Sequence, residues 1–169
     1  MHEGIVVRQW LNRLKALALS PSSYPKTKLS RIRTWAIAEL VYSSGVAPAE
    51  IISLRPRDLD SRRPALFLLA REIPVTQAAL EAIEAWTSVS TSYWGRNSAY
   101  LFSLVQQPDA PMTTEGLAIE FNDIGDQIGF RISARELRNA LILELLRLGM
   151  PADQLAYITG MSAKKIAAM

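Results

Sequence analysis

Apolar residues recur at helical spacing along most of this chain. In residues 4–18 they fall on one side of a short amphipathic helix: Val7, Trp10, Leu11, Leu14 and Leu17. A polar, proline-bearing linker follows at residues 20–28, and Ser30 is expected to cap a helix that runs to about Tyr42. Pro48 fits the first turn of another short helix, because proline is tolerated there.

Two adjacent segments, "ALFLLA" (65–70) and "REIPVT" (71–76), predict short strands, and they carry the only convincing β signal. Thr76 is expected to cap a helix to about Trp86, which a Ser/Thr-rich loop at 88–98 then follows. The segment "YLFSLV" (100–105) fits either a buried strand or a helical turn, and "QQPDAPMT" is expected to be a loop.

The last third of the chain predicts four helices. One begins at Thr113 or Thr114 and is closed by Gly129. The next, in "SARELRNALILELLRLGM" (133–150), starts with a capping box of Ser133 and Glu136, and two short helices follow from Pro151 and Ser162. The pattern therefore predicts a mainly α fold with a small antiparallel β-sheet formed around residues 65–75.

Composition excludes several classes of function. The 169 residues are 49% apolar, include no cysteine and contain no apolar run long enough to span a bilayer. His2 is the only histidine, so neither a Ser/His/Asp triad nor a histidine metal site can be built from this chain. We expect no metal and no cofactor, no membrane partner, no signal peptide and a cytoplasmic location.

Charge is distributed unevenly along the chain, whose net charge is +3. Residues 1–63 carry a net charge of +6, residues 64–130 carry −6 and residues 131–169 carry +3. If the two basic segments meet in the fold, they form a positive face that suits a nucleic-acid partner. The alternative is that these charges only solvate the surface.

Arg135 and Arg138 lie one turn apart at the start of the helix from Ser133, where free backbone N–H groups and guanidinium groups together favour phosphate binding. Other cations are expected to contact duplex DNA, although a solvated helix start would equally explain the run near residue 30. These candidates are Lys28, Arg31, Arg33, Arg131, Lys164 and Lys165.

Four stretches in this order resemble the catalytic domain of tyrosine recombinases, the phage-integrase family. They are "AIAELVYSSGVAPAEIISLRPRDLD" (36–60), "REIPVTQAALEAIEAW" (71–86), "MTTEGLAIEFNDIGDQIGF" (112–130) and "ISARELRNALILELLRLGMPADQLAYITGMS" (132–162). The resemblance implies a tyrosine-recombinase catalytic-domain-like fold over residues 29–169, preceded by an N-terminal helix and linker at residues 1–28.

The resemblance also assigns roles position by position. The family's first catalytic arginine falls on Ala47, its hairpin lysine has no counterpart between Asp58 and Val75, and its later histidine or tryptophan falls on Met161. Arg138 matches the second arginine and Arg135 replaces a histidine. The nucleophilic tyrosine would lie just beyond Met169, so no catalytic residue is expected in this chain.

Several residues are expected to be structural under the same resemblance. Glu50 matches a glutamate that acts as a structural partner, and Arg71 is expected to be a surface or structural charge. Arg138 should lie near Glu50 and the 45–48 turn, either as a phosphate ligand or as the salt-bridge partner of Glu50, with Arg135 exposed beside it. Tyr157, within "LAYIT", is expected in the core.

The sequence thus favours a catalytically inactive, DNA-binding accessory or regulatory protein of a mobile element, plasmid or phage. Two alternatives stay open. One is a protein-interaction module whose C-terminal helix docks onto a recombinase partner or a second copy. The other is a divergent recombinase or relaxase with its nucleophile outside this sequence.

Overall fold

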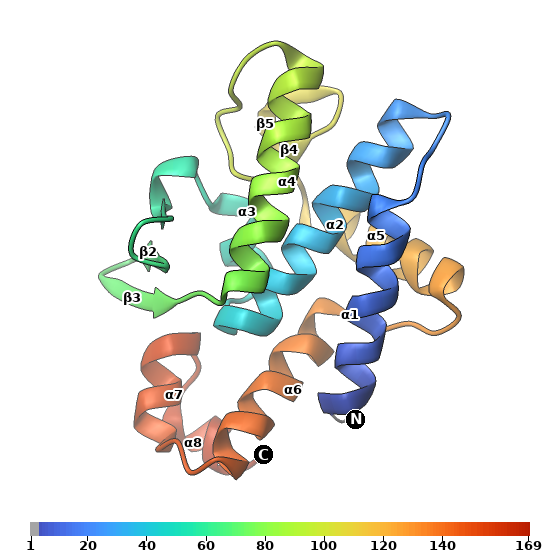
Figure 1. The fold of residues 1–169 in the computed structure, drawn as a ribbon. Coiled ribbons are helices and arrows are strands. Elements are labelled where there is room, and N and C mark those ends of the chain that lie inside the picture. The colour runs from blue at the N-terminus through green and yellow to red at the C-terminus, as the bar shows by residue number, and fades with distance from the viewer. Residues whose placement is uncertain (1–3) are drawn as a thin grey trace.

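The computed structural model describes residues 4–169, so His2 lies outside the described part of the chain. Its centre is helix α2 (Pro25–Ser44), which packs against α1 (Gly4–Leu19), α4 (Gln77–Trp94), α5 (Thr114–Ile128) and α6 (Ala134–Arg147). Figure 1 shows α1, α2 and α4 side by side, with a β-hairpin projecting from the opposite flank of α4.

Helix α2 is buried on nearly all of its faces, as expected for a helix with neighbours all round. It begins at Pro25 rather than at Ser30, so the linker is shorter than predicted. The physical reason is Pro25 itself, whose fixed φ and missing N–H suit the first helical position. Five residues thus separate α2 from α1, and α1 belongs to the same apolar core through Val7, Trp10 and Leu14.

The predicted hairpin is present and antiparallel. Strands β2 (Ala65–Leu68) and β3 (Arg71–Pro74) pair from Ala65 with Pro74 to Leu68 with Arg71, and a short β1 (Leu59–Asp60) adds a third strand beyond β2. The 3-10 turn η1 (Pro56–Asp58) and helix α3 (Pro48–Ser53) precede this sheet.

Two predictions in the middle of the chain are wrong. Helix α4 continues to Trp94, where the Ser/Thr composition predicted a loop. The reason is that Trp86 and Trp94 pack edge to face and each donates to a main-chain carbonyl in the segment after α4. The expected loop at 106–113 contains strand β5 (Gln107–Pro111), which pairs with β4 (Ser103–Leu104) as a second, two-stranded sheet.

The C-terminal helices follow the predicted starts. Thr113 caps α5, Ser133 and Glu136 form the capping box of α6, and Ser162 caps α8 (Ala163–Ala167). Helix α7 (Ala152–Thr159) packs against α8 and β3, so the end of the chain returns to the hairpin. None of the helices in the described part of the chain combines the length and apolar character needed to cross a bilayer.

Candidate phosphate-binding site

Arg138, on the second turn of α6, joins segments that are far apart in the sequence. Its Nε donates to the carbonyl oxygen of Gly45 at 2.7 Å, and its Nη2 donates to the carbonyl oxygen of Thr159 at 2.5 Å. The start of α6 therefore meets the turn after α2 and the end of α7. This confirms the predicted placement of Arg138 beside the 45–48 turn.

Glu50 closes the same turn, but its ion-pair partner differs from the predicted one. Its Oε2 accepts a hydrogen bond from the backbone N–H of Ala47 at 3.0 Å, and its Oε1 is paired with Arg71. The hypothesis that Arg138 is the salt-bridge partner of Glu50 is therefore wrong. Arg138 is bound to main-chain carbonyls instead, and Glu50 acts on it through charge rather than direct contact.

Arg71 is the residue whose position the sequence did not reveal. In β3 it lies on the same face as the buried Ile73, because side chains two positions apart share a face of a strand. This register carries its guanidinium inward, where Nη1 also donates to the carbonyl oxygen of Ile158 at 3.2 Å. Its side chain is 13% exposed. The inward direction of Arg71 could have been predicted from the pairing of "REIP" with "ALFL", because this register places Arg71 and Ile73 on the same, inner face of β3.

Glycine permits the close approach of these elements. A Cβ atom at Gly45 would lie 2.9 Å from Cγ2 of Thr159, and one at Gly160 would lie 2.8 Å from Nη1 of Arg71. Both glycines also have positive φ angles, of 69° and 70°. A larger residue at Gly45 would press on Thr159 in α7, and one at Gly160 would displace the guanidinium of Arg71.

Electrostatics leave the site positive. Burial lowers the pKa of Arg138, and the charges of Arg71 and Arg135 add to this effect, while Glu50 opposes it. Arg135 is exposed one turn away. Within residues 4–169 no acceptor is paired with Nη1 of Arg138, so part of its guanidinium is available. A cluster of three arginines and one carboxylate carries excess positive charge and can hold an anion such as a phosphate.

The basic run at the start of α2 does not belong to this site. Arg33 is 3% exposed, donates to the carbonyl oxygen of Ser103 at 2.7 Å and is paired with Glu120, so its prediction as a DNA ligand is wrong. The reason is that α4 and α5 cover the face of α2 that carries Arg33, which the mixed sequence "KTKLSRIRT" conceals. Lys28 and Arg31 are half-buried and tied to Ser20 and Gln127, respectively.

The other predicted cations are exposed but outside the Arg138 cluster. Arg131 forms a two-pronged ion pair with Asp126, at 2.7 and 2.8 Å, and this pair raises the pKa of Arg131 and lowers that of Asp126. Lys164 and Lys165 are exposed in α8, which begins shortly after Thr159. Their contact with DNA stays a prediction.

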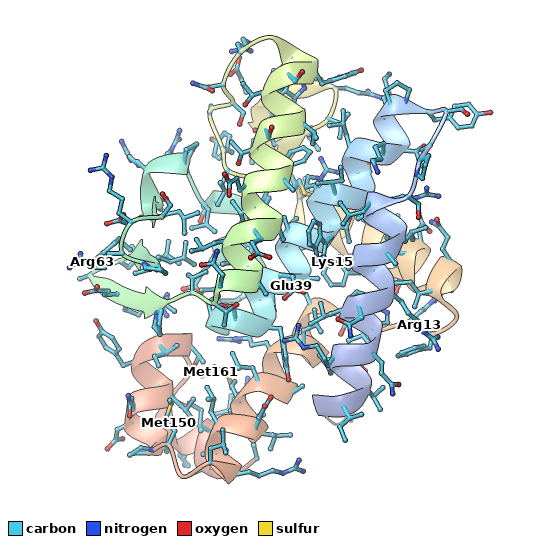
Figure 2. All side chains as sticks on the ribbon, in the orientation of Figure 1. Arg13, Lys15, Glu39, Arg63, Met150 and Met161 are labelled. Atoms are coloured by element: carbon cyan, nitrogen blue, oxygen red, sulfur yellow. The ribbon has the colours of Figure 1, made fainter. Side chains whose placement is uncertain are left out.

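Three positions singled out by the sequence have apolar or structural surroundings. Ala47 is the residue before α3 and offers only a methyl group. Met161 packs against a small apolar cluster of Ile142, Leu155 and Ile166, and Figure 2 shows it close to α7. Tyr157 was predicted in the core, but it is 51% exposed, and its hydroxyl accepts a hydrogen bond from the N–H of Glu72 at 3.1 Å.

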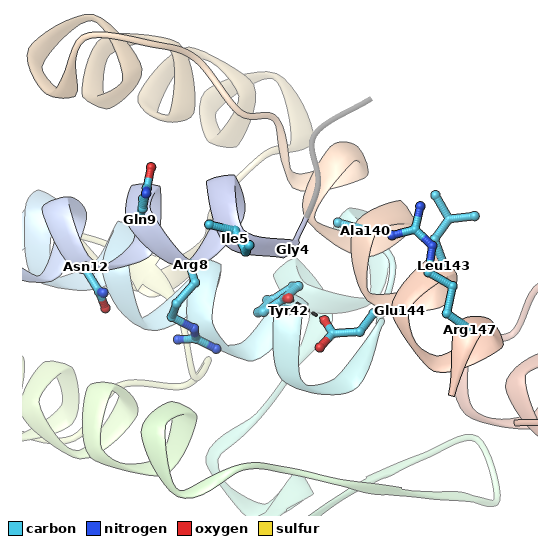
Figure 3. A pocket seen from close by; sticks show the side chains of 10 residues that line it. All are labelled: Gly4, Ile5, Arg8, Gln9, Asn12, Tyr42, Ala140, Leu143, Glu144 and Arg147. Carbon is cyan, nitrogen blue, oxygen red and sulfur yellow. Dashed lines mark hydrogen bonds between the residues drawn. The ribbon is translucent and has the colours of Figure 1, made fainter. Parts of the chain in front are cut away.

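No group of three or more histidine, cysteine, aspartate or glutamate side chains in residues 4–169 is arranged to hold a metal ion. A cavity of about 730 Å³ lies between α1, α2 and α6, and Arg138 does not line it. Figure 3 shows Arg8, Tyr42 and Glu144 converging there, with the hydroxyl of Tyr42 donating to Glu144 at 2.5 Å.

Comparison with known proteins agrees with this geometry. The sequence profile of the phage integrase family matches residues 16–169. The fold superimposes on the crystal structure of XerA recombinase with a TM-score of 0.79 and 16% identity, covering 98% of this chain and 56% of that one. XerH site-specific recombinase bound to difH substrate, in a pre-cleavage complex, gives a TM-score of 0.76 and 13% identity over 98% and 48% of the two chains.

The Tn1549 transposon integrase in complex with transposon right end DNA gives a TM-score of 0.72 and 15% identity, covering 99% of this chain and 60% of that one. No curated protein sequence matches this chain. The chain spans about half the length of the solved structures that it resembles.

Proposed function

Because this chain belongs to the phage integrase family, we propose that it binds duplex DNA without cutting or joining it, as an accessory or regulatory protein of a mobile element, plasmid or phage. The observation that carries the proposal is the cluster of Arg71, Arg135 and Glu50 around Arg138, in which α6, β3 and the 45–48 turn present more positive than negative charge.

Two solved structures of similar fold support DNA as the ligand. XerH is described bound to its difH substrate, and the Tn1549 integrase is described in complex with transposon right end DNA. In this chain, a phosphate placed at Arg138 would meet the free part of its guanidinium and the exposed side chain of Arg135. Such contacts are sequence-independent, so we expect dissociation constants of about 10⁻⁴–10⁻⁶ M at physiological salt.

The absence of strand cleavage is supported by the side chains around the site. Phosphodiester cleavage needs preorganised donors for the charge that develops on the phosphate, and losing one donor costs about 10²–10³ in rate. Ala47 supplies no donor beside Glu50, Met161 supplies none at the end of α7, and no lysine lies between Asp58 and Val75. Arg135 adds charge but cannot shuttle a proton, because guanidinium stays protonated.

The test is fluorescence anisotropy of a labelled, mixed-sequence duplex across a range of salt concentrations. We expect binding at low salt whose affinity falls steeply with added salt, because neutralised phosphates release counterions. Absence of binding at the lowest salt would overturn the proposal. A single-stranded probe of the same length measures how far binding depends on the duplex.

A second function, as a protein-interaction module, is favoured by the cavity between α1 and α6. Ile5, which lines it, is 72% exposed. Figure 3 shows Leu143 beside Arg147 on α6, with Arg8 on α1 near Tyr42. A sizing measurement by light scattering over a range of protein concentrations separates the two functions. A dimer that persists when DNA binding is absent would favour the interaction module.

A further inference from the structure

A smaller pocket adjoins the cavity between α1, α2 and α6 and shares Arg8, Tyr42 and Glu144 with it. Its volume is about 360 Å³. We call it the α2–α6–α7 pocket, since these three helices contribute most of its lining together with the junction between β3 and α4. Pockets that bind small molecules enclose roughly 300–1,000 Å³, so this one has room for a small organic ligand.

Apolar side chains from α6, α7 and the segments beside them line much of this pocket. Val75 precedes α4, Leu141 and Leu145 belong to α6, Met150 follows α6, and Ile158 belongs to α7. All except Val75 are only partly buried, so packing within residues 4–169 leaves apolar surface uncovered there. Covering such surface favours a ligand with an apolar part.

The charged side chains of the lining carry one excess negative charge. Glu39 and Glu144 contribute carboxylates, and Arg8 is the only cation among the lining residues from 4 to 169. Glu144 accepts a hydrogen bond from the hydroxyl of Tyr42, and no cation in the described part of the chain pairs with it. Figure 3 shows Tyr42 between Arg8 and Glu144. One positive charge on a ligand would balance this lining.

Glu39 is the buried member of the set. Its side chain is 7% exposed, whereas that of Arg8 is 47% exposed, and Nη1 of Arg8 stays 3.6 Å from its Oε1, longer than an ordinary hydrogen bond. Burial raises the pKa of Glu39, and the charges of Arg8 and Lys15 oppose this shift without cancelling it. A buried carboxylate that its neighbours compensate incompletely favours a further cationic donor.

The pocket shares residues with the support of the candidate phosphate site. Ile158 and Thr159 line it, and their carbonyl oxygens accept hydrogen bonds from Arg71 at 3.2 Å and from Arg138 at 2.5 Å. Leu141 also lines it, one helical turn after Arg138 on α6. A ligand in the pocket would therefore contact the residues that hold both arginines in place.

We propose that the α2–α6–α7 pocket binds a small amphipathic amine and that the bound amine strengthens phosphate binding at Arg138. The ammonium group pairs with Glu39 and Glu144, and the apolar part packs on side chains such as Val75 and Ile158. A metal ion would leave the apolar surface uncovered, and a neutral or anionic ligand would leave the excess negative charge unbalanced. The site goes beyond the proposed function, and only its effect on DNA rests on that function.

The added positive charge and the ordering of the end of α7 both act in the same direction. The ammonium group offsets the carboxylates that lie behind the arginine cluster, which favours an anion at that cluster. Contacts with Ile158 and Thr159 restrict the turn whose carbonyls hold Arg71 and Arg138, so less freedom is lost when a phosphate binds.

The test of the site is a titration of the ¹⁵N-labelled protein with tryptamine, followed by backbone amide shifts and without DNA. We expect saturable binding with a dissociation constant of about 10⁻⁴–10⁻³ M, because the ligand is small. The largest shifts should fall at Val75, Leu141, Ile158 and Thr159. The matched alcohol, indole-3-ethanol, and the matched acid, indole-3-acetate, should bind at least about tenfold more weakly, because neither offers an ammonium group.

Three substitutions of glutamate by glutamine test the role of charge. Glu39→Gln and Glu144→Gln should each weaken tryptamine binding about tenfold. Glu144 is exposed, so its variant should fold even if the change at the buried Glu39 impairs folding. Glu84→Gln is the matched control, because Glu84 is exposed on α4 and does not line the pocket, and it should bind like the wild type.

The effect on DNA is measured by fluorescence anisotropy of a mixed-sequence duplex, with and without saturating tryptamine at constant ionic strength. The amine should tighten duplex binding by the wild type and by Glu84→Gln at least about fivefold. At the same concentration of tryptamine, Glu144→Gln should show little change. This comparison separates the pocket from any general effect of the cation on DNA.

Equal binding of tryptamine and its acid or alcohol analogue would overturn the amine site, and so would unsaturated shifts scattered over the acidic residues of segment 64–130. An amine that binds in the pocket but leaves duplex affinity unchanged overturns the link to Arg138. A wild type that does not bind duplex DNA at low salt contradicts the proposed function, whereas the titration without DNA still decides the amine site.

Discussion

Nε of Arg138 lies 2.7 Å from the carbonyl oxygen of Gly45, although 93 residues separate the two in the sequence. This hydrogen bond fixes the start of α6 against the turn that precedes α3. It also uses one side of the guanidinium for structure and leaves the other for an anion. Arg138 therefore has two roles, and they can be separated by substitution.

Replacing Arg138 by alanine should lower the free energy of unfolding by about 2–3 kcal/mol, because two hydrogen bonds from a charged donor are removed and the carbonyls of Gly45 and Thr159 are left without their partner. Arg138→Lys should recover little of this loss, since an ammonium group cannot reproduce the planar fork. Urea unfolding measures both. An unchanged stability of Arg138→Ala would contradict the structural role.

Replacing Arg135 by alanine should leave stability within about 0.5 kcal/mol, because its side chain is exposed. It should weaken duplex binding and reduce the salt slope by about one, since one phosphate fewer would be neutralised. Arg96→Ala is the matched control. Arg96 is also an exposed arginine, but it is paired with Asp109 and lies in the connection after α4. If both variants change the slope equally, the site around Arg138 is not where DNA binds.

A nicked suicide duplex, which traps a covalent protein–DNA intermediate, should give no adduct with this chain. We expect the same when a tyrosine is appended after Met169, because Ala47 and Met161 would still lack donors. The readout is a band on a denaturing gel. An adduct mapped to Tyr157 or to the appended tyrosine would favour the divergent recombinase or relaxase instead.

Glu120→Gln should destabilise the fold by about 3–5 kcal/mol, because it leaves the buried Arg33 without its counter-charge. Burial lowers the pKa of Arg33 and raises that of Glu120, which shows that both charges are held in an unfavourable environment. The double variant Arg33→Met/Glu120→Met should recover most of the stability. Its DNA affinity should match the wild type, and a large loss would restore Arg33 as a DNA ligand.

Stability should fall between about pH 10 and pH 12 because of Tyr42. Burial, together with the hydrogen bond to Glu144 and the charge of that carboxylate, raises the pKa of Tyr42 from 10.0 to about 12. The native state therefore holds the hydroxyl proton of Tyr42 more tightly than the unfolded chain does. The resulting stabilisation is complete below about pH 10 and disappears as the pH rises through about 12. We expect it to contribute about 1–2 kcal/mol.

Urea unfolding at about pH 9, below the titration, and at about pH 12, near the native pKa of Tyr42, measures most of this contribution when the wild type is compared with Tyr42→Phe. The phenylalanine variant cannot ionise at this position, so its stability should fall less over the same range. A parallel fall in both proteins would show that other groups cause the loss.

The helices were predictable wherever a local signal marks an end. The capping box of Ser133 and Glu136, the threonine before α5 and the glycine after it all act within one turn, so the sequence shows them directly. The placement of Arg138 beside Gly45 was predictable only through the resemblance, because nothing local joins residues 93 positions apart.

The wrong or missed placements of Arg33, Tyr157 and Arg71 share a cause, which is burial decided by distant segments. Arg33 is in a basic run that looks solvent-exposed, and it becomes buried because α4 and α5 cover α2. Tyr157 is in an apolar stretch that looks buried, and it is exposed because α7 turns Leu155 inward instead. Arg71 needed the strand register before its inward direction could be known.

The packing of α1 has a consequence for synthesis on the ribosome. Nε1 of Trp10 donates to the carbonyl oxygen of Phe130, 120 residues later, and α1 also contacts α6. Because a ribosome adds about 5–20 residues per second, Phe130 is synthesised roughly 6–24 s after Trp10. During that interval Val7, Trp10 and Leu14 lack the part of their cover that α5 and α6 provide, so we expect α1 to be a segment that a chaperone binds and at which aggregation can start.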